Sequence, residues 1–233
     1  MKLVVTHLLI TMGVVAGVPV PEAPGIPTPS AARSQLNGLK VASSGSSDGY
    51  TRAKFPHWEP IDGKCDAREF ALKRDGTNVQ TKSDCSVTSG RWQSPYDGAT
   101  WTNPLDLDID HMVPLKDAWV SGASSWTTTQ RKNFANDVTR PQLWTVTNTI
   151  NRSKGDRSPD SWKPPLKTFH CKYAESWVQV KSYYSLTVTM AEKAALSQML
   201  DTCAGTPSNA NLNQLQRVPY FGAILMAAIV GLM

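Results

Sequence analysis

Residues 105–115 read Leu-Asp-Leu-Asp-Ile-Asp-His-Met-Val-Pro-Leu, and this stretch decides the fold. Apolar side chains alternate with carboxylates as far as Asp110, and a period of two is typical of a β-strand with one apolar face. Pro114 has no N–H to donate to a neighbouring strand, so a strand over 105–113 is expected to end there. Asp110 and His111 are therefore predicted to lie at a strand end, on a rim rather than in a core.

The residues that follow predict short helices and one more strand. Thr127 and Gln130 have the spacing of a capping box, and Thr189 and Glu192 repeat it before a helix near the end of the chain. A short helix is expected over 115–120, an apolar strand over 143–146 and a helix start over 148–154. The order strand, helices, strand, helix predicts an α+β fold with a small antiparallel sheet and surrounding helices.

A second informative stretch is residues 148–156, Asn-Thr-Ile-Asn-Arg-Ser-Lys-Gly-Asp. It places Asn151, which offers an amide oxygen, at a helix start with cations after it. Histidines are scarce, and His7 falls in an apolar leader. Of the others, only His111 stands directly beside a carboxylate.

These two stretches resemble the ββα-metal core of HNH nucleases, in the variant that has Asp-His and then Asn in the helix. The likeness to small exported HNH proteins of bacteria and fungi is carried by residues 111–115, 118–123, 134–137 and 151–156. In those proteins the corresponding motifs are, in the same order, Asp-His-Val-Pro-Leu, Ala-Trp-x-Ser-Gly-Ala, Phe-Ala-Asn-Asp and Asn-x-Ser-Lys-Gly-Asp. In looser form the likeness extends from Tyr50 to Cys203. It implies a ββα-metal fold and endonuclease activity.

The resemblance also implies a division of roles. Asp110 and Asn151 would hold a divalent cation, with Mg²⁺ expected and Mn²⁺ as an alternative, because oxygen ligands suit such ions. The cation would stabilise charge on the phosphoryl group as a Lewis acid. His111, whose ordinary pKa is near neutrality, would accept the proton of the attacking water.

The chain departs from the family at the middle Asn, which fixes the loop between the base and the metal ligand. Gln142 stands close to that position, and either Gln142 or Asn136 is expected to replace it. Asp108 is expected either to orient a metal ligand through a hydrogen bond or to face water.

Three cations are candidates for contacts with the phosphate backbone, namely Lys154, Arg152 and Arg91. Residues 148–172 contain six Lys or Arg against two Asp, and the net charge of the chain is +5. This balance suits phosphate contacts, although a solvated surface has the same composition. The chain contains no sequence-reading module, so a nucleic-acid substrate cut with low sequence specificity is expected, DNA in preference to RNA.

Both ends of the chain have features of an exported protein. Residues 1–17 resemble a cleaved signal peptide, with a retained anchor as the alternative. Residues 18–49 are rich in Pro, Ser and Gly and predict a pro-segment or linker before a nuclease domain over 50–203. A polar spacer (204–217) and an apolar tail (218–233) have the order of a GPI-anchor signal; a tail anchor or a packed helix are the alternatives.

Four cysteines remain after the leader, and an even number in an exported chain predicts two disulfides. Cys65–Cys85 and Cys171–Cys203 are the favoured pairs, because each closes a local loop. Zinc ligation is the alternative, although there is no Cys-x-x-Cys pair.

Two other functions compete with a nuclease. The first is a catalytically inactive cell-surface binding domain of the same fold, stapled by its disulfides. The second is a zinc hydrolase that uses His111, His57 or His170 together with acidic residues, although the chain has no His-Glu-x-x-His motif. Intact Asp110, His111 and Asn151 favour the nuclease over the binding domain.

Overall fold

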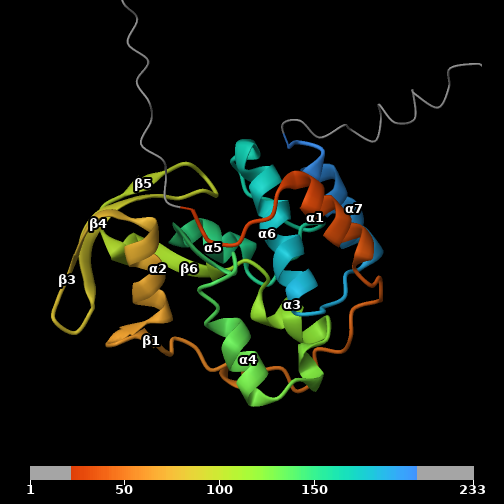
Figure 1. The fold of residues 1–233 in the computed structure, drawn as a ribbon, viewed down its shortest axis with the longest axis horizontal. Coiled ribbons are helices and arrows are strands. Elements are labelled where there is room, and N and C mark those ends of the chain that lie inside the picture. Colours follow the sequence, from red (N-terminus) through yellow and green to blue (C-terminus); the bar gives the residue numbers. More distant parts are fainter. Residues whose placement is uncertain (1–21, 204–233) are drawn as a thin grey trace, which may run out of the picture.

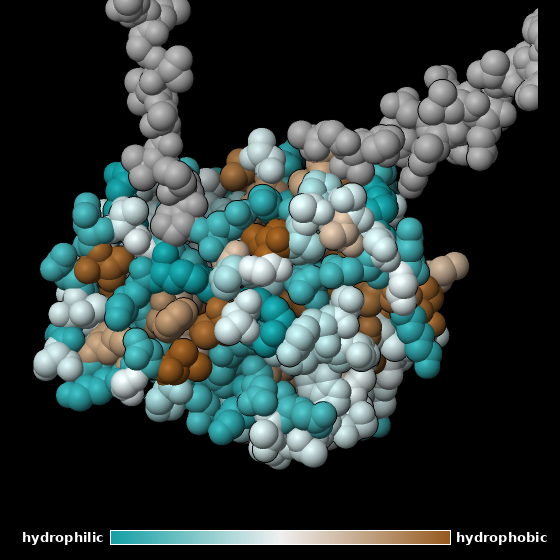
Figure 2. All heavy atoms as spheres, viewed as in Figure 1, coloured by the Kyte–Doolittle hydropathy of each residue, from teal (hydrophilic) through white to brown (hydrophobic). Residues whose placement is uncertain are grey.

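The computed structural model describes residues 22–203. The expected signal peptide, the polar spacer and the apolar tail all lie outside the described residues. Within the described part, no helix is both long and apolar enough to cross a membrane. The face of the molecule in Figure 2 is mostly hydrophilic, and its apolar side chains occur in small separate groups.

An antiparallel pair of strands lies between a smaller end built on α2 and a larger end built of helices (Figure 1). β6 (Leu107–His111) pairs with β7 (Leu143–Thr147) in an unbroken register of five residue pairs. Helix α5 (Asn148–Lys154) follows β7 directly, and it ends where Gly155 adopts a φ of 56°, a left-handed conformation that favours glycine. The strand and the helix predicted over these residues are confirmed, and so is the α+β class with small antiparallel sheets.

Both faces of the β6–β7 pair are buried. Leu107 and Ile109 pack with α2 (Ala67–Asp75) and Trp92 in the smaller of two apolar clusters. Trp144 belongs to the larger cluster, which fills the space among the helices. The strand pair therefore lies between two cores, and the single apolar face that the alternation predicted is only one of its two covered sides.

The first strand of this pair also begins later than predicted. Leu105 lies in a turn of 3₁₀ helix, η2 (Pro104–Asp106), and is 77% exposed. The Asn103 side chain accepts a hydrogen bond from the Leu105 N–H, which binds that segment into a turn. Asp110 and His111 do stand at the strand end, but they are only 6% and 4% exposed. The prediction of a rim position was therefore wrong, because segments distant in sequence cover this strand end.

The smaller end of the molecule contains the other strands. β3 (Thr77–Thr81), β4 (Val87–Gln93) and β5 (Thr100–Trp101) form an antiparallel sheet, and β1 (Pro60–Asp62) pairs with β2 (Cys65–Asp66). The predicted disulfide Cys65–Cys85 is present and joins β2 to the turn between β3 and β4. This covalent link ties the two-stranded sheet to the three-stranded sheet.

Most of the helices lie at the larger end. They are α1 (Pro29–Gly38), α3 (Leu115–Val120), α4 (Thr128–Ala135), α6 (His170–Tyr183) and α7 (Met190–Leu200), with short 3₁₀ turns η1 (Arg52–Lys54), η3 (Ala123–Ser125) and η4 (Lys167–Phe169). Both predicted capping boxes are present: Thr127 and Gln130 begin α4, and Thr189 and Glu192 begin α7. The predicted helix over 115–120 is also confirmed.

Residues 22–49 differ from the linker that their composition predicted. The segment contains α1, whose Ala32 and Leu36 are fully or almost fully buried in the larger cluster. Arg33 forms an ion pair of 2.6 Å with Asp201 just after α7, and Val41 bridges to a strand-like residue before that helix. The composition did not reveal this packing, because the apolar surface that buries Ala32 and Leu36 is provided by the distant helices α6 and α7.

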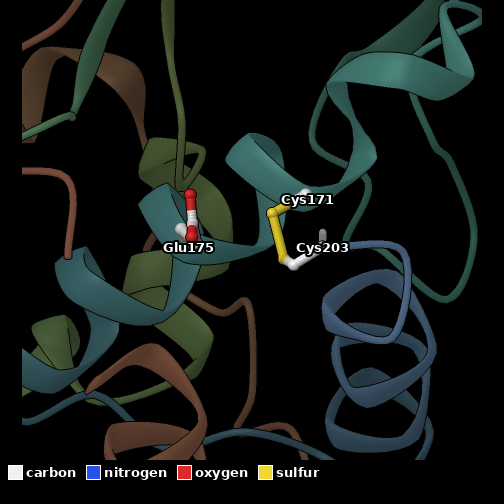
Figure 3. A group of neighbouring side chains, drawn as sticks. All are labelled: Cys171, Glu175 and Cys203. Carbon is white, nitrogen blue, oxygen red and sulfur yellow. A yellow bond between two sulfur atoms is a disulfide. The ribbon is translucent and has the colours of Figure 1, made fainter. Parts of the chain in front are cut away.

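The second predicted disulfide, Cys171–Cys203, joins the first turn of α6 to the end of α7 (Figure 3). The carboxylate of Glu175 lies beside it, and one oxygen of Glu175 comes within 4.8 Å of both sulfur atoms. Because the two sulfurs are bonded to each other, they are not thiolate ligands. The favoured pairing is thus confirmed over zinc ligation.

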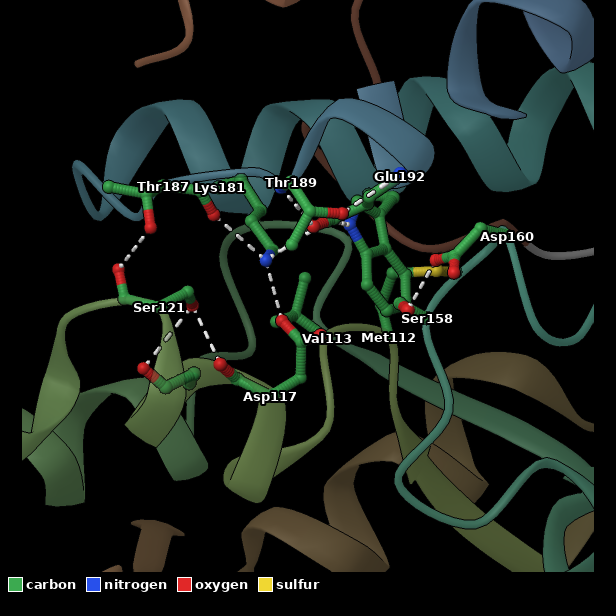
Figure 4. Close-up of polar contacts among 12 residues, drawn as sticks. Met112, Val113, Asp117, Ser121, Ser158, Asp160, Lys181, Thr187, Thr189 and Glu192 are labelled. Carbon is green, nitrogen blue, oxygen red and sulfur yellow. Dashed lines mark hydrogen bonds and ion pairs between the residues drawn. The ribbon is translucent and has the colours of Figure 1, made fainter. Parts of the chain in front are cut away.

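A buried lysine connects three helices of the larger end (Figure 4). The ammonium of Lys181 on α6 lies 2.6 Å from Asp117 of α3 and 2.9 Å from Glu192 of α7, and it donates a hydrogen bond to the Thr187 carbonyl. The Lys181 side chain is fully buried, and both carboxylates are nearly so. This ion cluster ties α3, which follows the His111 segment, to the two C-terminal helices.

Candidate active site

One cavity collects side chains from distant parts of the chain. Its volume is about 190 Å³, and its lining is Arg52, Ile109, Asp110, His111, Pro114, Leu115, Asn151, Arg152, Gly155 and Asp156. The end of β6 and the middle of α5 thus bring Asp110, His111 and Asn151 to the same space. A larger cavity of about 600 Å³, bordered by α4 and the end of α6, contains none of these three side chains.

The imidazole of His111 is held in one tautomer. Its Nε2 lies 2.9 Å from the carbonyl oxygen of Ala135, and a carbonyl only accepts hydrogen bonds, so Nε2 carries the hydrogen. Nδ1 therefore keeps its lone pair, and it forms no hydrogen bond within residues 22–203. The Trp58 ring stacks on the imidazole at 5.5 Å. Burial lowers the pKa of His111 to about 3, so the ring is neutral at physiological pH, and protonation on Nδ1 requires a nearby negative charge that stabilises the imidazolium.

The carboxylate of Asp110 has two donors on one oxygen. Its Oδ2 accepts hydrogen bonds from the Tyr96 hydroxyl at 2.5 Å and from the Lys154 ammonium at 2.6 Å. Oδ1 forms no hydrogen bond with the described part of the chain. Burial raises the pKa of Asp110, while the adjacent ammonium of Lys154 opposes that shift. We expect the carboxylate to be ionised, because the ion pair and the hydroxyl both favour the charged form.

Asn151 is oriented by a third carboxylate. Its Nδ2 donates to Asp108 Oδ2 at 3.2 Å, across the junction of α5 and β6. This contact fixes the amide so that its oxygen is the group left for a ligand. Asp108 therefore takes the first of its two expected roles, a hydrogen bond to a candidate metal ligand.

These donors suit a hard divalent cation. Asp110 Oδ1 and Asn151 Oδ1 both belong to residues that line the cavity, and neither atom has a hydrogen-bond partner in residues 22–203. Carboxylate and amide oxygens are ligands that Mg²⁺ and Mn²⁺ accept, and one or two protein groups are enough when phosphate and water complete the sphere. The residues present thus fit such an ion.

Gln142 and Asn136 both fix backbone around His111. The Gln142 amide donates to the Val113 carbonyl at 3.0 Å and accepts from the Val113 N–H at 3.1 Å, two residues after the histidine. Asn136 instead holds the segment that carries Trp58: its amide accepts from the Glu59 N–H and donates to the Pro56 carbonyl. Gln142, just before β7, thus fixes the backbone that follows His111, and Asn136 fixes the residues that cover the imidazole.

Replacing Gln142 with Leu should destabilise the protein by about 1–3 kcal/mol for each of the two Val113 groups that lose their partner. Gln142 is fully buried, so water cannot replace the lost bonds. Urea unfolding with intact disulfides measures the change. Gln93→Leu is the matched control, since Gln93 is exposed and its one side-chain contact is 3.4 Å long. Equal stability of the two variants would contradict the pinning role.

The three cations that were expected to bind phosphate differ in where they lie relative to the cavity. Arg152 lines the cavity, and Arg52, which the sequence analysis did not single out, lines it as well. Arg91 lies on β4 and is absent from the lining. Lys154 is fully buried and donates to Asp110, to His111 O and to Met112 O, so it cannot reach a phosphate at the surface. Its position corrects the expected role, because helix α5 turns this side chain inward under β6.

Two further residues of the site were missed from sequence. Tyr96 lies in the loop between β4 and β5, and Trp58 precedes β1. No local pattern links either residue to Asp110 or His111, because their contacts depend on how distant loops cover the strand end. The phenol of Tyr96 beside a buried carboxylate is visible only in three dimensions.

The other histidines do not join His111 around a common ligand. His57 Nδ1 contacts the Phe55 carbonyl, and its Nε2 accepts from Arg52. His170 contacts the Pro164 carbonyl and is absent from the cavity. In the described residues, no three His, Cys, Asp or Glu ligand atoms that include His111 lie within 4.8 Å of one another. This arrangement gives no support to the zinc hydrolase.

Comparison with known proteins agrees with the resemblance seen in the sequence. Residues 66–199 match the family model described as the C-terminal domain of GmrSD restriction endonucleases. A protein of Arthroderma benhamiae named "Uncharacterized secreted protein" is 58% identical over 185 residues, which cover 79% of this chain and 91% of the relative. No solved structure gives a significant match. The matched span includes Asp110, His111, Gln142 and Asn151, and the HNH resemblance is confirmed. The chain belongs to the family of the GmrSD restriction endonuclease C-terminal domain.

Proposed function

We propose that this protein is an exported, metal-dependent endonuclease that hydrolyses the phosphodiester bonds of nucleic acid. The observation that carries the proposal is the shared cavity of Asp110, His111 and Asn151, which are distant in sequence but line one space. In this proposal β6, β7 and α5 form a ββα-metal core, and the cation is Mg²⁺ or Mn²⁺. The family match supports nuclease chemistry and a divalent metal in general.

The side chains divide the reaction among themselves. His111 takes the proton of the attacking water on Nδ1, while the Ala135 carbonyl on Nε2 holds the ring and stabilises the imidazolium that forms. An anionic phosphodiester in the cavity also favours that imidazolium, which raises the low pKa of the buried ring. Asp110 and Asn151 hold the cation, which when bound supplies Lewis-acid stabilisation of the phosphoryl charge.

Substrate binding is assigned to the arginines of the cavity. Arg52 and Arg152 line it from η1 and α5, and a guanidinium can bind phosphate through two parallel hydrogen bonds. Such contacts give affinity without reading sequence, so the enzyme cuts with low specificity, and DNA is the substrate that we propose. Export is supported by the two disulfides and by the similar protein of Arthroderma benhamiae, whose name describes it as secreted.

Chelation should abolish the activity reversibly. Supercoiled plasmid should be nicked in the presence of Mg²⁺ or Mn²⁺, excess EDTA should stop the reaction, and added cation should restore it, since only the metal was removed. Gel electrophoresis follows the conversion, and circular dichroism checks that EDTA leaves the fold intact. A structured RNA assayed in parallel decides between DNA and RNA.

Two outcomes would contradict the proposal. Nicking that continues undiminished in EDTA would show that the reaction does not use a divalent cation. Plasmid that is bound but remains uncut with every divalent cation tested would identify a non-catalytic binding domain.

A further inference from the structure

We propose that Tyr96 and Lys154 are positioning residues that occupy one oxygen of Asp110, so that the other oxygen alone is offered to the cation. The inference rests on the proposed function and deepens it. It replaces the phosphate contact that the sequence suggested for Lys154 with a role inside the protein.

The two donors meet on the same atom. Asp110 Oδ2 lies 2.5 Å from the Tyr96 hydroxyl and 2.6 Å from the Lys154 ammonium, whereas Oδ1 forms no hydrogen bond within residues 22–203. An oxygen with two short charge-assisted hydrogen bonds has both of its lone-pair directions used. The carboxylate therefore cannot rotate to exchange its oxygens without breaking both bonds.

Lys154 is itself rigidly held. Its ammonium has three hydrogens and makes three contacts, with Asp110 Oδ2 and with the carbonyl oxygens of His111 at 2.8 Å and Met112 at 3.0 Å. The side chain is fully buried. The charge is thus locked against the backbone directly after Asp110, so the end of β6 and its carboxylate are fixed as one unit.

The position of Lys154 in the helix adds a second consequence. Asn151 and Lys154 lie three residues apart on α5, about one helical turn. The same helix therefore presents one candidate metal ligand and holds the other in place.

Tyr96 reaches Asp110 from the loop between β4 and β5, whereas Lys154 reaches it from α5. Its ring is fully buried and packs near the rings of Trp162, Phe169 and Tyr173, at centroid distances of 5.5–5.8 Å. Its carbonyl accepts a hydrogen bond from Leu166, which fixes the loop. The Tyr96 hydroxyl and the Lys154 ammonium together compensate the carboxylate for the water that it loses on burial.

The test is the affinity for Mn²⁺, measured without turnover by electron paramagnetic resonance of the free ion. Tyr96→Phe removes one hydroxyl and keeps the ring, so the fold should be retained. We expect the Mn²⁺ dissociation constant to rise about 10-fold, at the low end of what loss of a partner of a metal ligand costs. The melting temperature should fall by only a few degrees, because the Lys154 ammonium still donates to the same oxygen, and the protein should stay folded at the temperature of the binding assay.

Tyr173→Phe is the matched control. Tyr173 is also fully buried, its ring centre lies 5.7 Å from that of Tyr96, and its hydroxyl has no hydrogen-bond partner within residues 22–203. This variant should bind Mn²⁺ like the wild type. Lys154→Met should weaken binding further, and if it fails to fold, the pair of Tyr variants still decides the question.

The outcomes separate this inference from the proposed function. If the wild type nicks DNA but Tyr96→Phe and Tyr173→Phe bind Mn²⁺ equally well, the positioning role is wrong and the nuclease stands. If Tyr96→Phe alone weakens Mn²⁺ binding but the wild type cuts no nucleic acid, the positioning role stands and the nuclease is wrong. Absence of Mn²⁺ binding to the wild type would overturn the positioning role, and the nicking assay would then decide the nuclease by itself.

Discussion

His111→Ala is expected to lower the rate of plasmid nicking by about 10²–10⁴-fold, the usual contribution of a general base. The imidazole is the proposed base of the cavity: the Ala135 carbonyl fixes Nε2, and Nδ1 has a lone pair left for a proton. Alanine has no group that can replace it. Single-turnover nicking at saturating Mg²⁺ measures the chemical step, and Mn²⁺ binding should be nearly unchanged, because the imidazole is not one of the two proposed metal ligands.

His111 is buried, so a loss of activity must be separated from a loss of fold. The ring packs on Trp58, and its removal leaves a void of about the size of an imidazole. Added imidazole should therefore restore part of the rate of His111→Ala. His111→Gln fills most of the void and can still donate to the Ala135 carbonyl, but its amide is not a base, so it should be as inactive as the Ala variant. If His111→Gln were nearly as active as the wild type, His111 would not be the general base.

Lys181→Met is expected to cost about 3–5 kcal/mol of the free energy of unfolding, the usual penalty for breaking a buried ion cluster. Its ammonium lies between Asp117 at 2.6 Å and Glu192 at 2.9 Å, and the lysine side chain is fully buried. Methionine fills a similar volume, so the loss comes from two buried carboxylates left without a cation. Urea unfolding with intact disulfides measures it.

The chain offers a control on the same helix. Lys172 is 45% exposed; it pairs with Glu22, which is 46% exposed, and lies 4.0 Å from the buried carboxylate of Glu175. Because the ammonium itself is in water and its second contact is long, Lys172→Met should cost about 1 kcal/mol. Burial raises the pKa of Glu192, and the loss of Lys181 should raise it further. A raised carboxyl pKa gives stability that is present at low pH and is lost as pH rises through the folded-state value. The deficit of Lys181→Met should thus be smaller near pH 5 than near pH 7. A deficit no larger than that of Lys172→Met would contradict the cluster's structural role.

The residue that fixes the backbone beside the proposed base differs in type from the one in the family motif. Gln142 takes a backbone-pinning role that the family motif gives to an Asn, because both side chains end in an amide with one donor group and one acceptor. The longer side chain of Gln reaches Val113 from the first residue before β7. A change of residue type at a motif position therefore need not remove its function.

The sequence by itself determined several elements through local patterns, and it named the candidate ligands through the resemblance to HNH nucleases. Period-two alternation located β6, capping boxes located α4 and α7, and the Asp-His and Asn motifs named Asp110, His111 and Asn151. Each of these signals depends on residues a few positions apart, where backbone hydrogen bonding is decided.

Tertiary structure alone decided burial and partnership. Contacts between distant segments decide three features of this protein. They turn Lys154 toward Asp110 and away from a phosphate, they bring Tyr96 to the site, and they pack residues 22–49 against the helices. The free energy of burying a charge or an apolar helix face is set by what covers it, and the identity of that cover is not written in the local sequence.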